Sequence, residues 1–303
     1  MGIRSIRLEL HDMPALSDNH RGALLMAGAM VGFTVNDAFI KLAAEDLPLF
    51  EVLFLRGLGT TLILGLVAWG RGWLRVRPRG RDGWLVLFRS LGECGAAWFF
   101  LTALVHMEIA NISAIMQALP LTVTLAAALF LGEPVGWRRI SAIVVGFLGV
   151  LLIVRPGGET FNVYSVLALG AVVCVTVRDL AARRMSAGVP SVVAALAASG
   201  AITIMAAVGA VAVEWQPLGP VHAAWVLGAI GCVVVSYILS VAAMRVGEIG
   251  AVAPFRYTSL LAAIAIGAAV FGTFPDALTL SGAALVVASG LSPLSRERRR
   301  ATV

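Results

Sequence analysis

The sequence predicts an all-α polytopic membrane protein with ten transmembrane helices arranged as two inverted five-helix repeats. Three observations support this: the composition is strongly apolar, the apolar residues form long continuous runs, and one pattern of runs and turns occurs twice. Of the 303 residues, 59% are hydrophobic and 13% are charged, against about 45–50% and about 25% in soluble domains. That much apolar surface excludes an ordinary water-soluble fold.

The apolar runs are long enough to cross a hydrocarbon layer of about 30 Å as helices. They do not alternate with polar residues, which excludes the strands of a membrane barrel. We expect transmembrane helices at residues 22–43, 50–69, 84–105, 109–131, 139–154, 163–182, 190–213, 222–244, 250–272 and 276–292.

The repeated unit is clearest in the segment Ile109–Pro156, where an apolar run containing Pro120 ends at the turn Gly132–Glu133 and a second run follows. The pattern returns in Ile249–Pro293, with Gly272 at the turn. Three matched pairs share an offset of 142 residues: Asp37 and Asp179, Lys41 and Arg183, Pro48 and Pro190. Because five spans per half is an odd number, the second half must enter the membrane upside down. Inverted repeats are typical of alternating-access transporters, with the substrate site near the midplane between the halves.

The predicted organisation has five parts. These are a cytoplasmic N-terminal tail (1–21), a first repeat (22–154), a periplasmic linker (155–162), a second repeat (163–292) and a basic cytoplasmic tail (293–303).

The positive charges predict the orientation. Seventeen of the 23 Lys and Arg residues fall in the two tails and in the loops on the same side, and the loops on the other side hold Arg155 alone. By the positive-inside rule both termini are cytoplasmic. The net charge of +6 therefore reports topology, and we expect no nucleic-acid partner.

Several motifs carry a family resemblance. They are Gly132-Glu133 with the arginines that follow, Gly146-Phe147-Leu148-Gly149-Val150, the Ala253-Pro254 break, Asn36-Asp37-Ala38 with Lys41, and Pro254-Phe255 with Tyr257. Together they resemble the EamA branch of the drug/metabolite transporter superfamily, over residues 22–292. The second half departs from the first by having Thr273 where Glu133 stands. The resemblance implies a secondary carrier for small metabolites in the bacterial inner membrane. Relatives handle amino acids, S-adenosylmethionine, riboflavin and metallophores.

Ionisable residues inside the predicted spans are the functional candidates, because each costs about 2.5–3.5 kcal/mol on insertion scales. They must face the protein interior or a watery cavity. The candidates are Asp37, Lys41, Arg56, Arg89, Glu93, Arg178, Asp179 and Arg256.

Three pairs of these residues stand four positions apart, so each pair shares a helix face. They are Asp37 with Lys41, Arg89 with Glu93, and Asp179 with Arg183. The first and third pairs lie toward opposite membrane faces. We interpret them, together with Arg178, as gating or coupling groups; static pairs that neutralise charge during insertion are the alternative.

The candidates for substrate contact are Arg256, Tyr257, Gln117, Arg89, Glu93, Trp98 and Arg56. Guanidinium groups suit carboxylates, and the intramembrane excess of basic over acidic residues favours a substrate with an anionic group. Arg256 follows the helix break at Pro254, and two roles stay open for it: substrate contact, or pairing with an acid such as Glu93 or Asp37. Pro120 is expected to kink its span.

Two of these candidates have a second interpretation. Gln117 could line the cavity or bond between helices. Trp98 could stack on a planar substrate, or it could face lipid or belong to the core.

The sequence thus predicts a secondary transporter for a small zwitterionic or anionic metabolite. An amino-acid-derived or S-adenosylmethionine-like cargo is favoured, and riboflavin or a metallophore is the alternative. A polytopic membrane enzyme and a channel are the rivals of a different class. We expect no cofactor and no metal, because the three cysteines and four histidines are scattered. Protons are the favoured coupling ion, with Asp37, Glu93 or Asp179 as carriers, and uncoupled exchange stays open.

Overall fold

The computed structural model describes residues 18–133, 135–157, 162–186, 188–246 and 252–301, and within these ranges it contains helices and turns but no strand. The predicted all-α class is confirmed. The helices are α1 (Asp18–Ala43), α2 (Leu49–Gly70), η1 (Trp73–Arg75), α3 (Arg81–His106), α4 (Ile109–Met116), α5 (Leu119–Leu131), α6 (Trp137–Val154), α7 (Val163–Arg184), α8 (Ser191–Ala210), α9 (Pro220–Val246), η2 (Ala253–Tyr257), α11 (Thr258–Val270) and α12 (Ala277–Ala301).

Each of the ten predicted spans has a helix in the described part of the chain. Eight segments are long and apolar enough to cross a membrane, and α4 with α5 counts as one of them. Two shorter apolar helices, Pro254–Val270 and Ala277–Leu291, stand at the ninth and tenth spans. The polytopic membrane class is therefore confirmed.

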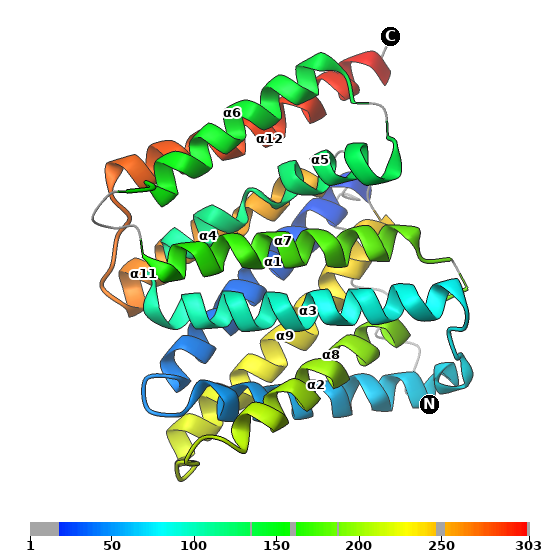
Figure 1. Cartoon of the computed structure of the whole chain (residues 1–303), viewed down its shortest axis with the longest axis vertical. Helices are drawn as coiled ribbons and strands as arrows, with labels where there is room; N and C mark the ends of the chain where they lie inside the picture. Colours follow the sequence, from blue (N-terminus) through cyan, green and yellow to red (C-terminus); the bar gives the residue numbers. More distant parts are fainter. Residues whose placement is uncertain (1–17, 134, 158–161, 187, 247–251, 302–303) are drawn as a thin grey trace, which may run out of the picture.

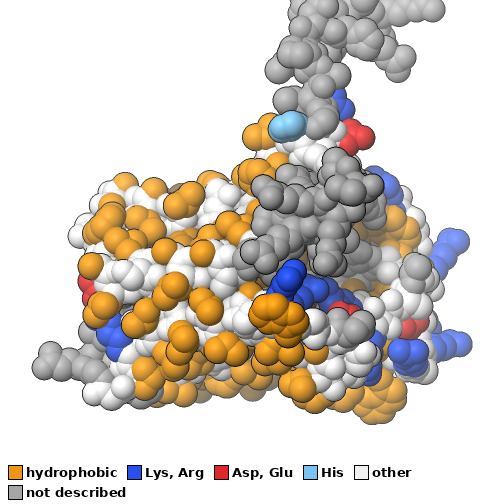
Figure 2. All heavy atoms as spheres, turned by 90° about the horizontal axis from the view of Figure 1, so that it is seen from above, with side chains coloured by type: hydrophobic (Ala, Val, Ile, Leu, Met, Phe, Trp, Pro, Cys, Tyr) orange, Lys and Arg blue, Asp and Glu red, His pale blue; other side chains and the backbone are white. Residues whose placement is uncertain are grey.

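The outer surface is apolar in the way that a lipid-facing surface must be. Leu129, Phe130 and Val208 are each 70% exposed, which a water-soluble fold would not tolerate over so many large side chains. Figure 2 shows hydrophobic side chains across much of the visible face and most of the visible Lys and Arg side chains toward one end. We call the end where α2, α5 and α7 finish, at Gly70, Leu131 and Arg184, the basic end.

Helix packing repeats when the two halves are exchanged. In the first half α1 packs on α9, and in the second half α7, which corresponds to α1, packs on α3, which corresponds to α9. When the two halves are exchanged, the α2–α8 pair maps onto itself, and so does the α6–α12 pair. Figure 1 shows each of these pairs lying side by side. An approximate twofold axis therefore relates the halves. The exact repeat boundaries at 154 and 163 stay a prediction.

Hydrogen bonds join the two halves across this axis. The Thr61 and Thr203 hydroxyls are 3.1 Å apart and 142 positions apart in sequence. Residues at matching positions of two repeats can meet only where the symmetry axis passes. The Gln117 amide donates to the Ser259 hydroxyl at 3.0 Å and so joins α4 to α11, the helices of the repeated unit.

The repeated turn has a conformational cause. Gly132 and Gly272 both adopt left-handed backbone angles, with φ of 69° and 64°, which favour glycine because it lacks a Cβ atom. The matched Gly residues in the two copies of the unit therefore terminate the α5 and α11 helices in the same way.

Both prolines of the unit stand where a span is interrupted. The α4 helix ends at Met116 and α5 begins at Leu119, so Pro120 lies in the first turn of α5. Pro254 likewise lies in the first turn of η2, just before α11. A proline has no backbone N–H to donate, and the first turn of a helix does not need one.

The α6 and α12 helices meet backbone to backbone at Gly149 and Gly282. A Cβ atom on Gly282 would lie 2.6 Å from the Gly149 carbonyl oxygen, and one on Gly149 would lie 2.7 Å from that of Gly282. Small residues permit this approach in membrane helices.

We expect Gly149→Ala to destabilise the fold by about 1–3 kcal/mol, because the added methyl group forces the two backbones apart. Thermal unfolding of the purified protein in detergent measures the effect. Gly200→Ala is the matched control, since nothing lies within 4 Å of a Cβ atom there. Equal melting temperatures for the two variants would contradict the proposed close contact.

Candidate functional site

Polar side chains from five helices gather between the two halves, away from the ends of their helices. We call this group the central polar network. It consists of Asn36 and Asp37 on α1, Arg56 on α2, Arg89 and Glu93 on α3, Arg178 and Asp179 on α7, and Tyr237 on α9.

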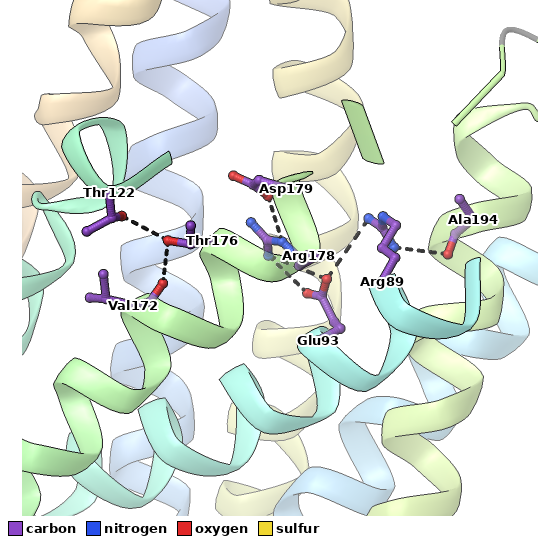
Figure 3. A network of polar contacts seen from close by, with 8 residues as sticks. All are labelled: Arg89, Glu93, Thr122, Val172, Thr176, Arg178, Asp179 and Ala194. Carbon is purple, nitrogen blue, oxygen red and sulfur yellow. Dashed lines mark hydrogen bonds and ion pairs between the residues drawn. The ribbon is translucent and has the colours of Figure 1, made fainter. Parts of the chain in front are cut away.

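One part of the network is a closed cluster of ion pairs around Glu93. Arg178 Nη1 lies 3.2 Å from Glu93 Oε1, and Arg178 Nε lies 2.9 Å from Asp179 Oδ1. Arg89 approaches Glu93 Oε2 at 4.0 Å and donates to the Ala194 carbonyl at 3.0 Å. Figure 3 shows Glu93 placed between the two guanidinium groups. The cluster therefore ties α3 to α7 and to α8.

The other part of the network is held open by an amide. Arg56 Nε donates to Asn36 Oδ1 at 3.1 Å, and Asn36 Nδ2 donates to Asp37 Oδ1 at 2.9 Å. Asn36 is 2% exposed. Arg56 and Asp37 interact electrostatically, but no ion pair within 4 Å joins them in the described part of the chain. The amide therefore stands between the two charges.

The charged side chains of the closed cluster retain some exposure although they lie inside spans. Glu93 is 12% exposed and Asp179 is 28% exposed. Charged groups do not face lipid without a large cost. We infer that this exposed surface is reached by water between the halves.

Two hydroxyl groups extend the polar centre beside the closed cluster. Thr122 and Thr176 are joined by their hydroxyl oxygens at 2.8 Å, and Thr176 also donates to the Val172 carbonyl at 2.8 Å. Figure 3 shows this chain of hydrogen bonds between α5 and α7. It links the fourth span to the sixth within the membrane.

The predicted Arg89–Glu93 pair is present, but the predicted Asp37–Lys41 pair is wrong. Lys41 Nζ donates to the Leu104 carbonyl at 2.7 Å and also to the Met107 carbonyl. The last carbonyls of a helix have no intrahelical partners and favour a cation. Lys41 therefore caps the end of α3.

The predicted Asp179–Arg183 pair is also wrong. Arg183 Nη1 lies 3.3 Å from Glu133 Oε1, with both side chains about half exposed at the basic end. Asp179 binds its neighbour Arg178 instead. The adjacent Arg184 donates to the Phe130 carbonyl at 2.7 Å. One turn of α7 thus separates a pair inside the span from contacts at its end.

The structure does not bring Arg256 and Tyr257 into the network. Arg256 is exposed, and no ion pair of it with Glu93 or Asp37 occurs among the residues that the structure describes. Tyr257 is 8% exposed. Its hydroxyl and ring lie against Gly290 of α12, in the space that a larger side chain at position 290 would fill. Of the two roles left open for Arg256, pairing with Glu93 or Asp37 is not seen among the described residues, and substrate contact stays a prediction. Tyr257 packs on α12.

Gln117 and Trp98 pack between helices. Gln117 is buried and bonds to Ser259. Trp98 stacks on Phe50 at 4.8 Å between ring centroids. The structure thus shows the helix-bonding and packing alternatives for these two residues.

Asn36 and Tyr237 were not among the candidates from sequence, although both belong to the network. Both lie in spans, but neither was singled out by a helix break or by an ion-pair spacing of its own. The available signal was that Asn36 precedes Asp37 at mid-span and that Tyr237 is one of only three tyrosines in the chain.

An all-helical membrane fold with two related halves and a charge-paired centre between them defines a carrier-type protein. Comparison with known proteins identifies the family. The profile of the EamA-like transporter family matches residues 20–155. The pseudopaline exporter of Pseudomonas aeruginosa is 30% identical over 294 residues, covering 92% of this chain and 97% of that protein. The chain belongs to the EamA-like transporter family.

Further relatives agree with this assignment. The S-adenosylmethionine uptake transporter of Rickettsia bellii is 25% identical over 89% of this chain and 92% of its own length. The riboflavin transporter of Vibrio cholerae is 29% identical over 68% of this chain and 70% of its own length. A solved crystal structure that is 21% identical superposes with a TM-score of 0.62 over 92% of this chain and 98% of that chain, which shows a shared fold.

We expect Glu93→Gln to lower stability by about 2–3 kcal/mol, because two guanidinium groups lose their shared carboxylate. Fully buried pairs lose about 3–5 kcal/mol, and the partial exposure of Glu93 reduces the effect. Thermal unfolding in detergent measures it.

Glu133→Gln is the matched control, since its pair with Arg183 is exposed and is worth about 0–1 kcal/mol. An equal effect of the two substitutions would contradict a structural role for the closed cluster.

Proposed function

We propose that this protein is a secondary transporter that moves a small zwitterionic metabolite across the bacterial inner membrane by alternating access, and that it is not an enzyme. The observation that carries the proposal is the central polar network itself. It lies between two halves related by an approximate twofold axis, where inverted-repeat carriers bind their cargo. The cargo classes of the relatives, S-adenosylmethionine, pseudopaline and riboflavin, support a small organic molecule.

The charge balance of the network favours a zwitterion over an anion. The tally from sequence counted five basic and three acidic residues, but Lys41 caps α3 and Arg256 lies outside. Three guanidinium groups and three carboxylates remain, so their formal charges cancel. An amino-acid-derived or S-adenosylmethionine-like cargo, with both an ammonium and a carboxylate, matches this balance better than riboflavin does.

The orientation follows from the positive charges. We place the basic end, with both termini, in the cytoplasm, because positively charged loops stay on that side of the inner membrane. The opposite end, where α6 finishes and α12 begins, then faces the periplasm.

The contacts at the two ends are the candidate gates. Arg183 with Glu133 lies at the basic end, and Arg155 with Asp276 lies at the opposite end. The hydrogen bond from Arg155, together with a backbone N–H of Thr279, holds the pKa of the Asp276 carboxyl below its usual range. Asp276 therefore stays ionised throughout the physiological pH range, and this pair can open only by moving apart.

If transport is coupled to protons, Asp37 is the favoured carrier. Arginines lie within 4 Å of Glu93 and Asp179 and form ion pairs with them. Among the described residues, Asp37 has only the Asn36 amide as a hydrogen-bond donor and has no ion pair. A carboxylate without a direct cation partner gains and loses a proton more easily.

Reconstituted protein should exchange S-adenosylmethionine across the membrane. We expect radiolabelled cargo to enter proteoliposomes preloaded with unlabelled S-adenosylmethionine faster than it enters protein-free liposomes. Free amino acids and riboflavin are tested in parallel. A folded protein that moves none of these compounds would contradict the proposal.

Proton coupling has its own measurement. We expect an imposed pH gradient to change the uptake rate of the wild-type protein several-fold, and Asp37→Asn to abolish this response, because the amide cannot bind the proton. Asp46→Asn, an exposed position at the opposite end, is the control. A gradient response that survives Asp37→Asn would exclude Asp37 as the carrier.

A further inference from the structure

The open part of the network, formed by Asn36, Asp37 and Arg56, differs from the closed cluster in having unused polar atoms. Each guanidinium of the closed cluster contacts a carboxylate. In the open part Arg56 uses only Nε, and Asp37 uses only Oδ1. Within the described ranges, both Nη groups of Arg56 and Oδ2 of Asp37 have no hydrogen-bond partner.

These unused atoms are accessible. The buried side-chain atoms that lack a hydrogen bond are Thr60 Oγ1, Ser90 Oγ, Thr102 Oγ1, Asn111 Oδ1, His222 Nδ1, Ser236 Oγ and Tyr257 Oη. No atom of Asp37 or Arg56 is among them, and both residues are half-buried, not fully buried. Asn36 bonds to both side chains, so the guanidinium and the carboxylate lie on either side of one amide.

In the second half, the residues at the matching positions form a direct ion pair. Arg178 and Asp179 stand 142 positions after Asn36 and Asp37. There the arginine donates directly to the neighbouring carboxylate at 2.9 Å. In the first half the equivalent of Arg178 is the amide of Asn36, which donates to Asp37 at the same distance of 2.9 Å but carries no charge. Among the described residues, Asp37 therefore has no ion-pair partner.

Asn36 also prevents Arg56 from closing the pair. Its carbonyl oxygen accepts from Arg56 and its amino group donates to Asp37, and its burial at 2% exposure fixes the side chain. The guanidinium and the carboxylate are thus held apart with free atoms on each. Two opposite charges kept apart in a low-dielectric interior are unfavourable unless a ligand completes both.

We propose that this open site binds the α-amino-acid group of the cargo, with its carboxylate on the Nη groups of Arg56 and its ammonium on Oδ2 of Asp37. A guanidinium matches a carboxylate with two parallel bonds, and Asp37 accepts the ammonium. This inference rests on the proposed transport function and assigns Asp37 to cargo binding as well as to coupling.

Probes that lack one charged group test the site directly. The first set is S-adenosylmethionine, its decarboxylated form, and 5′-methylthioadenosine, which lacks both groups. The second set is L-methionine, 3-(methylthio)propylamine and 4-(methylthio)butanoic acid. Thermal stabilisation of the purified protein measures binding, and counterflow in proteoliposomes measures transport.

We expect at least one parent compound to bind at least tenfold more tightly than each of its truncated forms. Arg56→Gln should remove the preference for the parent over the decarboxylated or amine-only probe. Asp37→Asn should remove the preference over 4-(methylthio)butanoic acid when L-methionine is the parent that binds. Arg56→Lys, which keeps the charge but loses the planar fork, should retain part of the preference. Asp46→Asn is the control for the Asp→Asn change.

Three results would overturn the site. The truncated probes could bind as tightly as their parents, or the Arg56 and Asp37 variants could weaken every probe equally while remaining folded. A folded wild-type protein could also bind neither parent compound. In this last case riboflavin counterflow separates the two proposals. Exchange of riboflavin would support the transport function and contradict only the amino-acid site. If no compound is exchanged, both the transport function and the site are contradicted.

Discussion

A charged side chain in hydrocarbon must find a partner or water, and this constraint determines how the helices of this protein are arranged around its centre. Three guanidinium groups and three carboxylates lie inside the spans of α1, α2, α3 and α7. The Glu93 cluster satisfies the constraint with direct ion pairs and so fixes α3 against α7. Arg56 and Asp37 satisfy it only in part, through Asn36. The same physical requirement thus produces a cluster of complete ion pairs around Glu93 and a group around Asn36 whose charges are not directly paired.

The approximate twofold axis explains why these two parts can be compared. Thr61 and Thr203, at matched positions, meet at the axis through their hydroxyl groups, and Gln117 bonds to Ser259 between the corresponding helices α4 and α11. The α6–α12 pair adds a contact between backbones at Gly149 and Gly282. Contacts on a symmetry axis change least when the halves move relative to each other. These contacts can therefore stay in place while the polar centre opens to either face of the membrane.

The spans, the turns and the helix breaks could be predicted from sequence because they depend on local properties. Apolar length specifies a span, and Gly132 and Pro120 act on their own backbone. The ion pairs could be predicted less well. Spacing of four residues shows that Asp37 and Lys41 share a helix face, but the long Lys41 side chain reaches the unpaired carbonyls at the end of α3. Arg183 likewise finds Glu133 on another helix. Such choices depend on which helices are neighbours, and a single helix does not contain that information.

Asn36 and Arg178 occupy equivalent places in two copies of one unit, yet only one of them is charged. Because the copies are inverted, that place occurs once in each orientation, and a single residue can differ without disturbing its twin. Duplication thus allows the two copies to differ in role. The copy with Arg178 stabilises the helix packing, and the copy with Asn36 can change the ligand that it binds. In this family, differences in cargo among descendants would then be sought first at the uncharged twin, position 36, and at the side chains that contact it.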